Sequence, residues 1–418
     1  MPPPSLNVAP PDIRMRGFTQ RVEVAAALGW IDDHAHVLPG EQVSMDDVTG
    51  RVLASHVVAS IAVPEFDRSA MDGYALRAAE TTGAGEYNPL AFSIVGHSFP
   101  GRPFEGTVQQ RSAIRIMTGA PVPDGVDAVV PAEYATEVDG LLTITRAVAP
   151  GQHVGHVGED IQSGSTVLST GRRLRPQDAG LAASLGLTHL QVVRRPRVRL
   201  LVTGNEVRPP GEPKRPYEIY DANSMMLRGL VRRDGGVIES HLRLGDDPQA
   251  IKLAMSAPGA DVVLVSGGSS VGAEDHAPRL LAELGDLAIH GIAMRPSSPA
   301  GMGRIGDAHV FLLPGNPVSC LCAYDFFAGR AIRRLGGLPA DWPYRQTRAV
   351  VARKIVSQVG RVDYVRVKLG EEGLEPLALS GASMLSSTTR ADGFVVVPAE
   401  GEGYGVGTDV TVHLYECP

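Results

Sequence analysis

The sequence predicts an α/β multidomain protein whose centre is a doubly wound, mostly parallel β-sheet. The chain has 418 residues, which is more than one ordinary hydrophobic core accommodates. Residues 196–335 alternate short apolar runs with helical segments, which is typical of βαβ units around a parallel sheet. Residues 88–142 and 345–418 contain short alternating strands separated by Gly and Pro. They predict a small β domain and a C-terminal β-barrel.

The composition indicates an ordinary globular protein, with 43% hydrophobic and 20% charged residues. A net charge of −7 argues against a nucleic-acid-binding surface. No run approaches the ~20 apolar residues that span a membrane, and the first residues lack the apolar core of a signal peptide. Cys320, Cys322 and Cys417 form no disulfide framework. We therefore expect structural thiols in a cytoplasmic protein, with no nucleic-acid or membrane partner.

The N-terminal part contains three segments with a helical pattern. In residues 19–29, Ala and Val recur at helical spacing. Residues 44–54 open with a Ser cap followed by acidic residues, which predicts a second helix. Residues 176–186 are Ala-rich and predict a third, short helix with a packing face.

Three polar segments in this part are candidate functional loops. Residues 63–76 (VPEFDRSAMDGYAL) are loop-like, yet carry enough apolar side chains to be anchored. Thr118 follows a predicted strand, where its hydroxyl either faces a cleft or closes a turn. Residues 151–164 are Gly-rich and contain adjacent acids, Glu159 and Asp160. For each of them a purely structural turn remains an alternative.

The central region predicts a regular alternation of strands and helices. Its strands are expected at residues 198–202, 236–242, 262–265, 287–293 and 310–313, and its helices at 223–233, from 247 onward, and at 317–335. Ligands of open α/β sheets bind beyond the carboxyl ends of the strands. The segments that follow the strands are therefore the first place to look for a site.

Four of these segments combine glycines with acidic side chains. They are TGNE, GDDP, SGGSSVG with the acids after it, and LPGNPVS, and they bring Glu206, Asp246 and Asp275 to one edge. Asn316 is placed to cap the last helix, with Pro317 at its first position. Glycine amides and a helix start suit an anion, and hard carboxylates suit Mg²⁺. The pattern predicts metal-assisted chemistry on a phosphorylated ligand, although GGSSVG alone is equally consistent with a tight turn.

Six motifs in order resemble the molybdopterin molybdenumtransferase (MoeA) family, which includes the E domain of gephyrin. They are PEFDRSAMDGYAL, RIMTGAPVPDGVDAVVPAE, GEDI, RPRVRLLVTGNE, SGGSSVG and LPGNPVS. The resemblance covers residues 15–418. It implies an enzyme that inserts molybdate into adenylylated molybdopterin and releases AMP with Mg²⁺, during molybdenum cofactor biosynthesis.

The resemblance also implies a domain plan and an assembly. Residues 15–63 and 151–195 would form a discontinuous linking and dimerisation domain around a small β domain at 64–150. Residues 196–340 would form the molybdopterin-binding domain, and 345–418 the β-barrel. The family is homodimeric, with the active cleft between subunits. A molybdopterin adenylyltransferase and apo-molybdoenzymes are further expected partners.

Matching positions imply the roles of individual residues. The catalytic set would be Asp72, Thr118, Asp160, Glu206, Asp246 and Asp275, with the last three as Mg²⁺ ligands. The substrate-binding set would be Gly267, Gly268, Ser269, Ser270, Gly272, Arg295, Ser298, Gly315, Asn316, Arg366 and Ser383. Within this set, Arg366 and Ser383 match positions associated with molybdate.

The chain departs from the family pattern at four positions. The usual Lys-Pro-Gly-Lys-Pro segment has Arg295 and Ser298 at its lysine positions, so one positive charge is lost. Asn205 replaces a common Asp, and Asp392 replaces a common Asn. These departures leave an alternative open: a divergent paralogue that acts as a carrier or scaffold for molybdopterin with weak catalysis. The sequence does not separate molybdate from tungstate.

Overall fold

The computed structural model describes residues 18, 21–270, 272, 274–378 and 382–415. The chain divides into two compact units, one formed by residues 42–191 and the other by the rest of the chain. The predicted α/β multidomain fold is confirmed, because the larger unit is organised around a mostly parallel six-stranded sheet.

This central sheet has the strand order β16-β13-β17-β21-β20-β18. Its strands are β13 (Arg197–Thr203), β16 (Val237–Leu244), β17 (Val262–Ser266), β18 (Asp286–His290), β20 (Gly301–Ile305) and β21 (Ala308–Leu313). The four strands from β16 to β21 run parallel, and β20 is antiparallel to both of its neighbours. The carboxyl ends of β13, β17 and β21 therefore meet at one edge.

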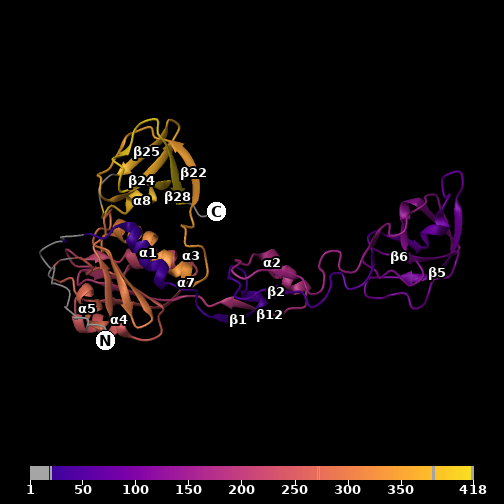
Figure 1. Ribbon diagram of the computed structural model, residues 1–418, viewed down its shortest axis with the longest axis horizontal. Helices are drawn as coiled ribbons and strands as arrows, with labels where there is room; N and C mark the ends of the chain where they lie inside the picture. Colours follow the sequence, from indigo (N-terminus) through magenta and orange to yellow (C-terminus); the bar gives the residue numbers. More distant parts are fainter. Residues whose placement is uncertain (1–17, 19–20, 271, 273, 379–381, 416–418) are drawn as a thin grey trace, which may run out of the picture. The chain divides into compact units, whose positions relative to one another are not determined.

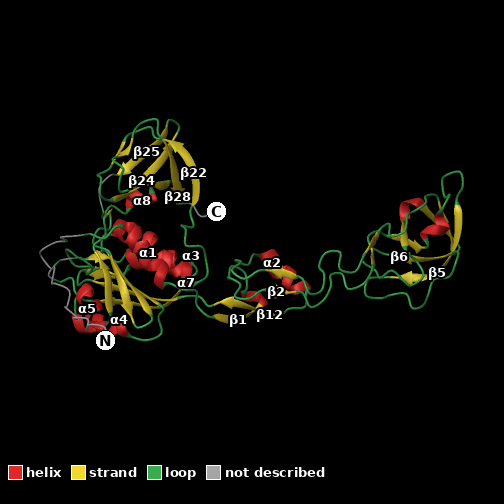
Figure 2. Cartoon of the chain, viewed as in Figure 1, coloured by secondary structure: helices red, strands yellow, loops and turns green. Residues whose placement is uncertain are grey.

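Helices cover both faces of this sheet (Figures 1 and 2). One face packs against α1 (Val24–His34), α3 (Asn223–Arg233), α6 (Pro317–Ala323), a π-helical turn (Tyr324–Ala328) and α7 (Gly329–Leu335). The other face packs against α4 (Pro248–Ser256) and α5 (Ala277–Leu284). Strand β13 shows the expected alternation, because Leu200 and Val202 join the first core while Leu201 joins the second.

The last strands of the larger unit form the predicted C-terminal β structure. They are β22 (Arg345–Val350), β24 (Val362–Gly370), β25 (Gly373–Ala378), β26 (Gly393–Val397) and β28 (Asp409–Leu414). The path β25-β24-β26-β28-β22 returns on itself through a bridge between Val351 and Leu374. Strand β19 (Met294–Arg295) joins β24 in parallel, so the segment after β18 connects the central sheet to these strands.

The smaller unit contains a second six-stranded sheet. It is built from β4 (Gly73–Leu76), β5 (Leu90–Ser98), β6 (Ser112–Ile116), β7 (Ala128–Pro131), β8 (Ala135–Val138) and β9 (Leu141–Ile144). Phe92 and Ile114 are among its fully buried side chains. This sheet agrees with the small β domain predicted from residues 88–142. The finer division of the chain into four domains stays a prediction.

Short elements complete the two units. They are β1 (Gly40–Ser44), β2 (Val57–Val58), β3 (Arg68–Ser69), β10 (Val154–Gly155), β11 (Thr166–Leu168), α2 (Pro176–Ser184), β12 (His189–Val193), β14 (Val207–Arg208), β15 (Ile219–Tyr220), β23 (Ile355–Val356), α8 (Ser386–Thr389), β27 (Gly403–Tyr404) and 3-10 turns at Met45–Asp47, Ala78–Thr81 and Ala132–Tyr134. None of the helices in the described residues is long and apolar enough to cross a membrane.

Three local predictions differ from the structure. The helix expected at 44–54 is wrong: only a 3-10 turn forms, because Gly50 takes a left-handed φ of 80° that ends helical backbone. The first helix begins at Val24 and extends to His34, later than expected, and residues 19 and 20 lie outside the described residues. Strand β20 was missed, since its Gly-rich sequence GMGRI has no alternating pattern.

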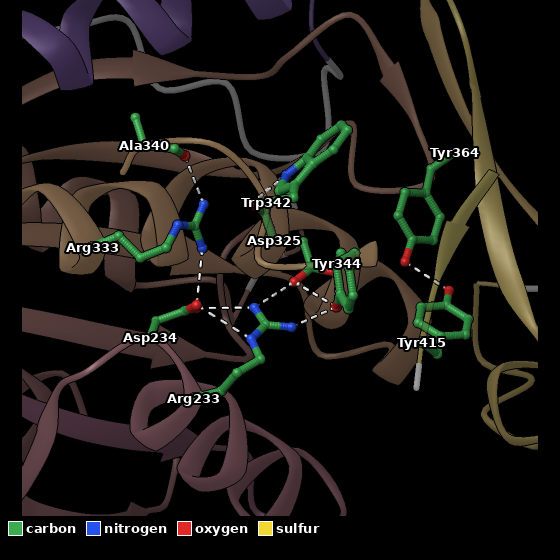
Figure 3. A network of polar contacts seen from close by, with 9 residues as sticks. All are labelled: Arg233, Asp234, Asp325, Arg333, Ala340, Trp342, Tyr344, Tyr364 and Tyr415. Atoms are coloured by element: carbon green, nitrogen blue, oxygen red, sulfur yellow. Dashed lines mark hydrogen bonds and ion pairs between the residues drawn. The ribbon is translucent and has the colours of Figure 1, made fainter. Parts of the chain in front are cut away.

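A buried charge network holds the helices of the larger unit to its C-terminal segment (Figure 3). The Arg233 guanidinium lies between two fully buried carboxylates, 2.9 Å from Asp234 Oδ2 and 3.0 Å from Asp325 Oδ1. The Tyr344 hydroxyl lies 2.9 Å from Asp325 Oδ2, and the Trp342 indole donates to the Asp325 carbonyl at 3.0 Å. Burial raises the pKa of Asp325, while the charge of Arg233 opposes that shift.

We predict that Asp325→Ala destabilises the larger unit by about 3–5 kcal/mol, because the buried Arg233 guanidinium loses one of its two carboxylates and the other, Asp234, is also paired with Arg333. Urea unfolding followed by tryptophan fluorescence measures this, since Trp30 and Trp342 both lie in this unit. The matched control is Asp307→Ala. Asp307 is an exposed side chain 3.5 Å from Arg304, and we expect no measurable change. Equal effects of the two substitutions would contradict the role given to the network.

Candidate active site

A cavity of about 750 Å³ opens at the edge where β13, β17 and β21 end. The glycine loop after β17, Gly267 to Ser270, forms one part of its wall. The predicted acids Glu206, Asp246 and Asp275 also line it, together with Gly315, Asn316 and Ser383. The structure thus brings together the segments that the sequence predicted to converge. We call this the acidic cavity.

The glycine loop needs glycine for two reasons. Gly267 and Gly268 have φ values of 97° and 56°, a region that L side chains rarely adopt. A Cβ on Gly267 would lie 2.5 Å from the Thr203 carbonyl oxygen, and a Cβ on Gly268 would lie 3.1 Å from the Thr203 hydroxyl. The loop therefore packs closely over the end of β13, and its conformation excludes larger residues.

Backbone amides orient two of the three acids. Asp275 Oδ2 accepts a hydrogen bond of 2.7 Å from the Gly272 amide, within the same loop. Asp246 Oδ2 accepts one of 3.0 Å from the Asn205 amide, and Asn205 Oδ1 accepts one of 3.2 Å from the Asp246 amide in return. Asp275 is thus held by backbone that follows β17, and Asp246, which follows β16, is held by backbone that follows β13.

The donor set fits Mg²⁺ held jointly by protein and substrate. The described residues include no cluster of three or more His, Cys, Asp or Glu side chains that could hold a metal ion. Mg²⁺ is usually bound by one or two carboxylates together with phosphate oxygens and water, rather than by a complete protein cage. Hard carboxylates beside an amide-rich loop match that requirement.

His290 supports the glycine loop from behind, and sequence reasoning missed it. Its Nε2 lies 2.9 Å from the Ser269 carbonyl oxygen, so this nitrogen carries the proton and donates it. The ring of Phe18 meets it edge-on, with 4.9 Å between centroids. Burial lowers the pKa of His290, which favours the neutral ring. No motif marks this residue, because its contact arises only when β18 lies beside the loop.

A second cavity, of about 780 Å³, adjoins the first and is rich in arginine. Its lining includes Arg21, Arg295, Arg361 and Arg366, along with Ser298. Pro299, Pro314 and Asn316 line both cavities, so Asn316 stands where they meet. We call this the arginine cavity. Its charge suits an oxyanion, whereas the acidic cavity suits a metal ion.

Asp363 explains how Arg295 is placed in the arginine cavity. This carboxylate is fully buried and contacts the guanidinium of Arg295. It also lies 3.3 Å from Arg361 Nε and accepts a hydrogen bond of 2.8 Å from Ser357 Oγ. Part of the positive charge of Arg295 is therefore balanced by Asp363. The sequence comparison of Arg295 with a lysine did not reveal this partner.

The other departures have structural explanations. Asn205 pairs with the loop of Asp246, as described above, and is not among the residues that line either cavity. Asp392 Oδ2 accepts a hydrogen bond of 2.7 Å from the Leu369 amide, at the end of β24. Among the four departures, Ser298 is the one that removes a positive charge from the lining of the arginine cavity. Its hydroxyl is buried with no hydrogen-bond partner among the described residues.

The remaining predicted residues lie in the smaller unit, where three loops join. Asp72 Oδ1 accepts hydrogen bonds of 2.7 Å from both the amide and the hydroxyl of Thr118. These bonds lower the pKa of Asp72. Strand β3 pairs with β10, and the Asp160 amide donates to the Val63 carbonyl, so the loop of Asp160 runs beside the loop that leads to Asp72. All three side chains are exposed.

Three family models match successive parts of this chain. Residues 22–186 match the MoeA N-terminal region (domain I and II), residues 199–334 the probable molybdopterin binding domain, and residues 348–415 the MoeA C-terminal region (domain IV). A molybdopterin molybdenumtransferase 2 from Mycobacterium tuberculosis is 35% identical, covering 88% of this chain and 94% of its own. The molybdopterin molybdenumtransferase of Haemophilus influenzae is 32% identical, covering 90% and 94%.

A crystal structure of a molybdopterin biosynthesis MoeA protein from Pyrococcus horikoshii shares the fold. Its TM-score is 0.83 at 31% identity, and the match covers 95% of this chain and 100% of that chain. The chain therefore belongs to the molybdopterin molybdenumtransferase (MoeA) family, as the six motifs predict, and it is a transferase. Membership of this family supports a role in molybdenum cofactor biosynthesis.

We predict that Thr118→Val raises the pKa of Asp72 toward its ordinary value. The substitution removes the hydroxyl donor and keeps the amide donor, so part of the downward shift is lost and Asp72 binds its proton at higher pH than in the wild type. A carboxyl-carbon NMR titration measures this. Thr82→Val, which alters another exposed hydroxyl of the same unit, should leave Asp72 unchanged. An unchanged Asp72 in Thr118→Val would refute the assignment.

Proposed function

We propose that this chain transfers molybdenum from molybdate to adenylylated molybdopterin and releases AMP in a Mg²⁺-dependent step. The observation that carries the proposal is the pair of adjoining cavities, one lined by carboxylates and a glycine loop and the other by arginines. The first suits a phosphorylated ligand with Mg²⁺, and the second suits a tetrahedral oxyanion. The names of curated relatives, molybdopterin molybdenumtransferase, support the transfer of molybdenum to molybdopterin.

The residues of the acidic cavity would bind the phosphates, hold the metal ion and accept a proton. The amides of the glycine loop would offer hydrogen bonds to phosphate oxygens, in a positive-φ conformation that favours glycine. Asp246 and Asp275, the two acids that backbone amides orient, would hold Mg²⁺ together with phosphate oxygens, and the bound ion would supply charge stabilisation to the phosphoanhydride as it breaks. Glu206, the third predicted ligand, lines the same cavity. Asp275 is held by the amide of Gly272, which lies shortly after the glycine loop. It would either hold the metal or take the proton of the attacking water.

The arginine cavity would hold the molybdate. Arg366 is 2% exposed and Arg295 is anchored by Asp363, so both guanidinium groups present fixed N–H directions. Ser383 lines the neighbouring acidic cavity, close in sequence to Ala382 in the arginine cavity. Asn316 lines both cavities, so the oxyanion and the phosphorylated ligand would come together beside it. Its side chain makes no capping hydrogen bond to α6.

The proposal also gives a role to three residues of the smaller unit, Asp72, Thr118 and Asp160, in a dimer. They form a joined set of loops in the smaller unit, whereas both cavities lie in the larger one. We propose that the chain works as a cytoplasmic homodimer in which this set serves the active cleft. We expect a monomeric variant with both cavities intact to lose the Mg²⁺-dependent activity.

An AMP-release assay tests the main proposal. Purified protein is mixed with adenylylated molybdopterin and Mg²⁺, with molybdate and tungstate in parallel reactions. We expect AMP release and activation of an apo-molybdoenzyme. Tight binding of the substrate without AMP release would instead support a carrier or scaffold, which the missing charge at Ser298 favours. A faster reaction with tungstate would reassign the oxyanion while keeping the chemistry.

We predict that Asp275→Asn abolishes AMP release and leaves the fold intact. The amide oxygen of Asn still accepts the hydrogen bond from the Gly272 amide, but the negative charge for a metal or a proton is gone. The control is Asp247→Asn. Asp247 caps α4 by accepting a hydrogen bond from the Gln249 amide. Asn caps a helix as well as Asp does, so this variant should retain activity. Circular dichroism checks folding. Normal turnover of Asp275→Asn would exclude the proposed role.

We predict that Ser298→Lys lowers the KM for molybdate by up to about fivefold, the equivalent of the ~1 kcal/mol that an exposed ion pair contributes. The added charge enters the arginine cavity, where the family usually has lysine. Arg295→Lys is the comparison, because Asp363 already balances that position and no gain is expected. Steady-state kinetics at varied molybdate measures both. A gain with Arg295→Lys and none with Ser298→Lys would reverse the interpretation.

A further inference from the structure

An apolar wall lines one side of the acidic cavity. It is formed by Val207 of β14 and by Ile219 and Tyr220 of β15, which pair in parallel. Ile219 is 53% exposed and Tyr220 is 45% exposed. Apolar and aromatic side chains that stay open to a cavity are typical of a ligand contact, because covering them with a ligand removes apolar surface from water. Nothing in the proposed phosphate chemistry uses this wall.

The wall is held rigidly in place. The Tyr220 hydroxyl donates to the Glu212 carbonyl at 3.1 Å, and Lys214 Nζ lies 5.4 Å from the centre of its ring. Arg208 and Glu218 close the strand pair with a contact of 2.6 Å. The ring is therefore preorganised, so a ligand that stacks on it pays little conformational entropy.

Acidic and acceptor groups flank the wall at both ends. Glu206 precedes Val207 in the chain, and Asp221 follows Tyr220; both line the cavity. Asp221 is 3% exposed, and its Oδ1 accepts a hydrogen bond of 2.9 Å from the Ser224 amide. Its Oδ2 forms an ion pair of 3.7 Å with Arg243 Nη1, lies 3.7 Å from His241 Nε2, and has no hydrogen-bond partner among the described residues. The amide oxygen of Asn223 is buried with no partner in the described residues.

We infer that the wall binds the pterin ring of the substrate, with its face on Tyr220 and its N–H edge toward Glu206 and Asp221. This inference rests on the proposed function and names the substrate group that this part of the site recognises. A pterin has a 2-amino group next to a ring N–H, so it presents two adjacent donors. Adenine presents its amino group next to a bare ring nitrogen, which carboxylates repel. The acidic flanks therefore select the pterin rather than the adenine of the same substrate.

Titration with two separate probes tests the inference without turnover. The first probe is 6-hydroxymethylpterin, whose fluorescence is quenched on stacking, and the second is AMP, followed by calorimetry. We expect Tyr220→Ala to weaken pterin binding about tenfold, as loss of one aromatic stacking partner does. Tyr220→Phe keeps the ring and loses only the hydroxyl's bond to the Glu212 carbonyl, so it should weaken pterin binding less than Tyr220→Ala does. The matched control is Tyr217→Ala, which removes a tyrosine that is 99% exposed and is not among the cavity's lining residues.

The outcomes separate this inference from the proposed function. Equal pterin affinity of Tyr220→Ala and Tyr217→Ala would overturn the inference, as would a wild type that does not bind the pterin. A loss of AMP affinity in Tyr220→Ala, with pterin binding unchanged, would assign the wall to adenine and overturn it too. The predicted pterin pattern in a protein that releases no AMP would sustain the inference and defeat the proposed function.

Discussion

The larger unit depends on the buried charge network of Arg233, Asp234 and Asp325. Removing these charges from water is costly, and the cost is offset only when each charge meets a partner in good geometry. Arg233 ends α3, and Asp325 lies in the π-helical turn of the helix that begins after Gly315. The network therefore fixes two helices whose first residues border the acidic cavity. Through Trp342 and Tyr344 it also fixes the segment that leads to the C-terminal strands.

The two cavities separate charges of opposite sign within one site. Carboxylates are held by backbone amides at the ends of parallel strands, while guanidinium groups come from the segment after β18 and from β24. The parallel pairing of β19 with β24 places Arg295 in register with Asp363, and that pairing joins the central sheet to the C-terminal strands. A phosphorylated ligand and an oxyanion thus find complementary environments on either side of Asn316.

Much of the acidic cavity was predictable, because its parts have local signatures. Gly267 and Gly268 follow a buried apolar strand, and parallel strands of a doubly wound sheet bring their carboxyl ends to one edge. Hence the sequence predicts Glu206, Asp246 and Asp275 beside the loop. By contrast, His290 and Asp363 have no signature in the sequence. Each acts through one contact between distant segments, and such a contact depends on strand pairing rather than on neighbouring residues.

The sequence by itself determined the fold class, the family and the residues that can carry chemistry, because these follow from periodicity, turn chemistry and ordered motifs. Only the tertiary structure decided which of those residues meet. It assigned the loops of Asp72 and Thr118 to the smaller unit and both cavities to the larger one, and it balanced Arg295 with Asp363. It also placed Tyr220 at the acidic cavity and left Tyr217 outside. The physical reason is that packing sets the direction of a side chain, and packing involves residues far apart in the chain.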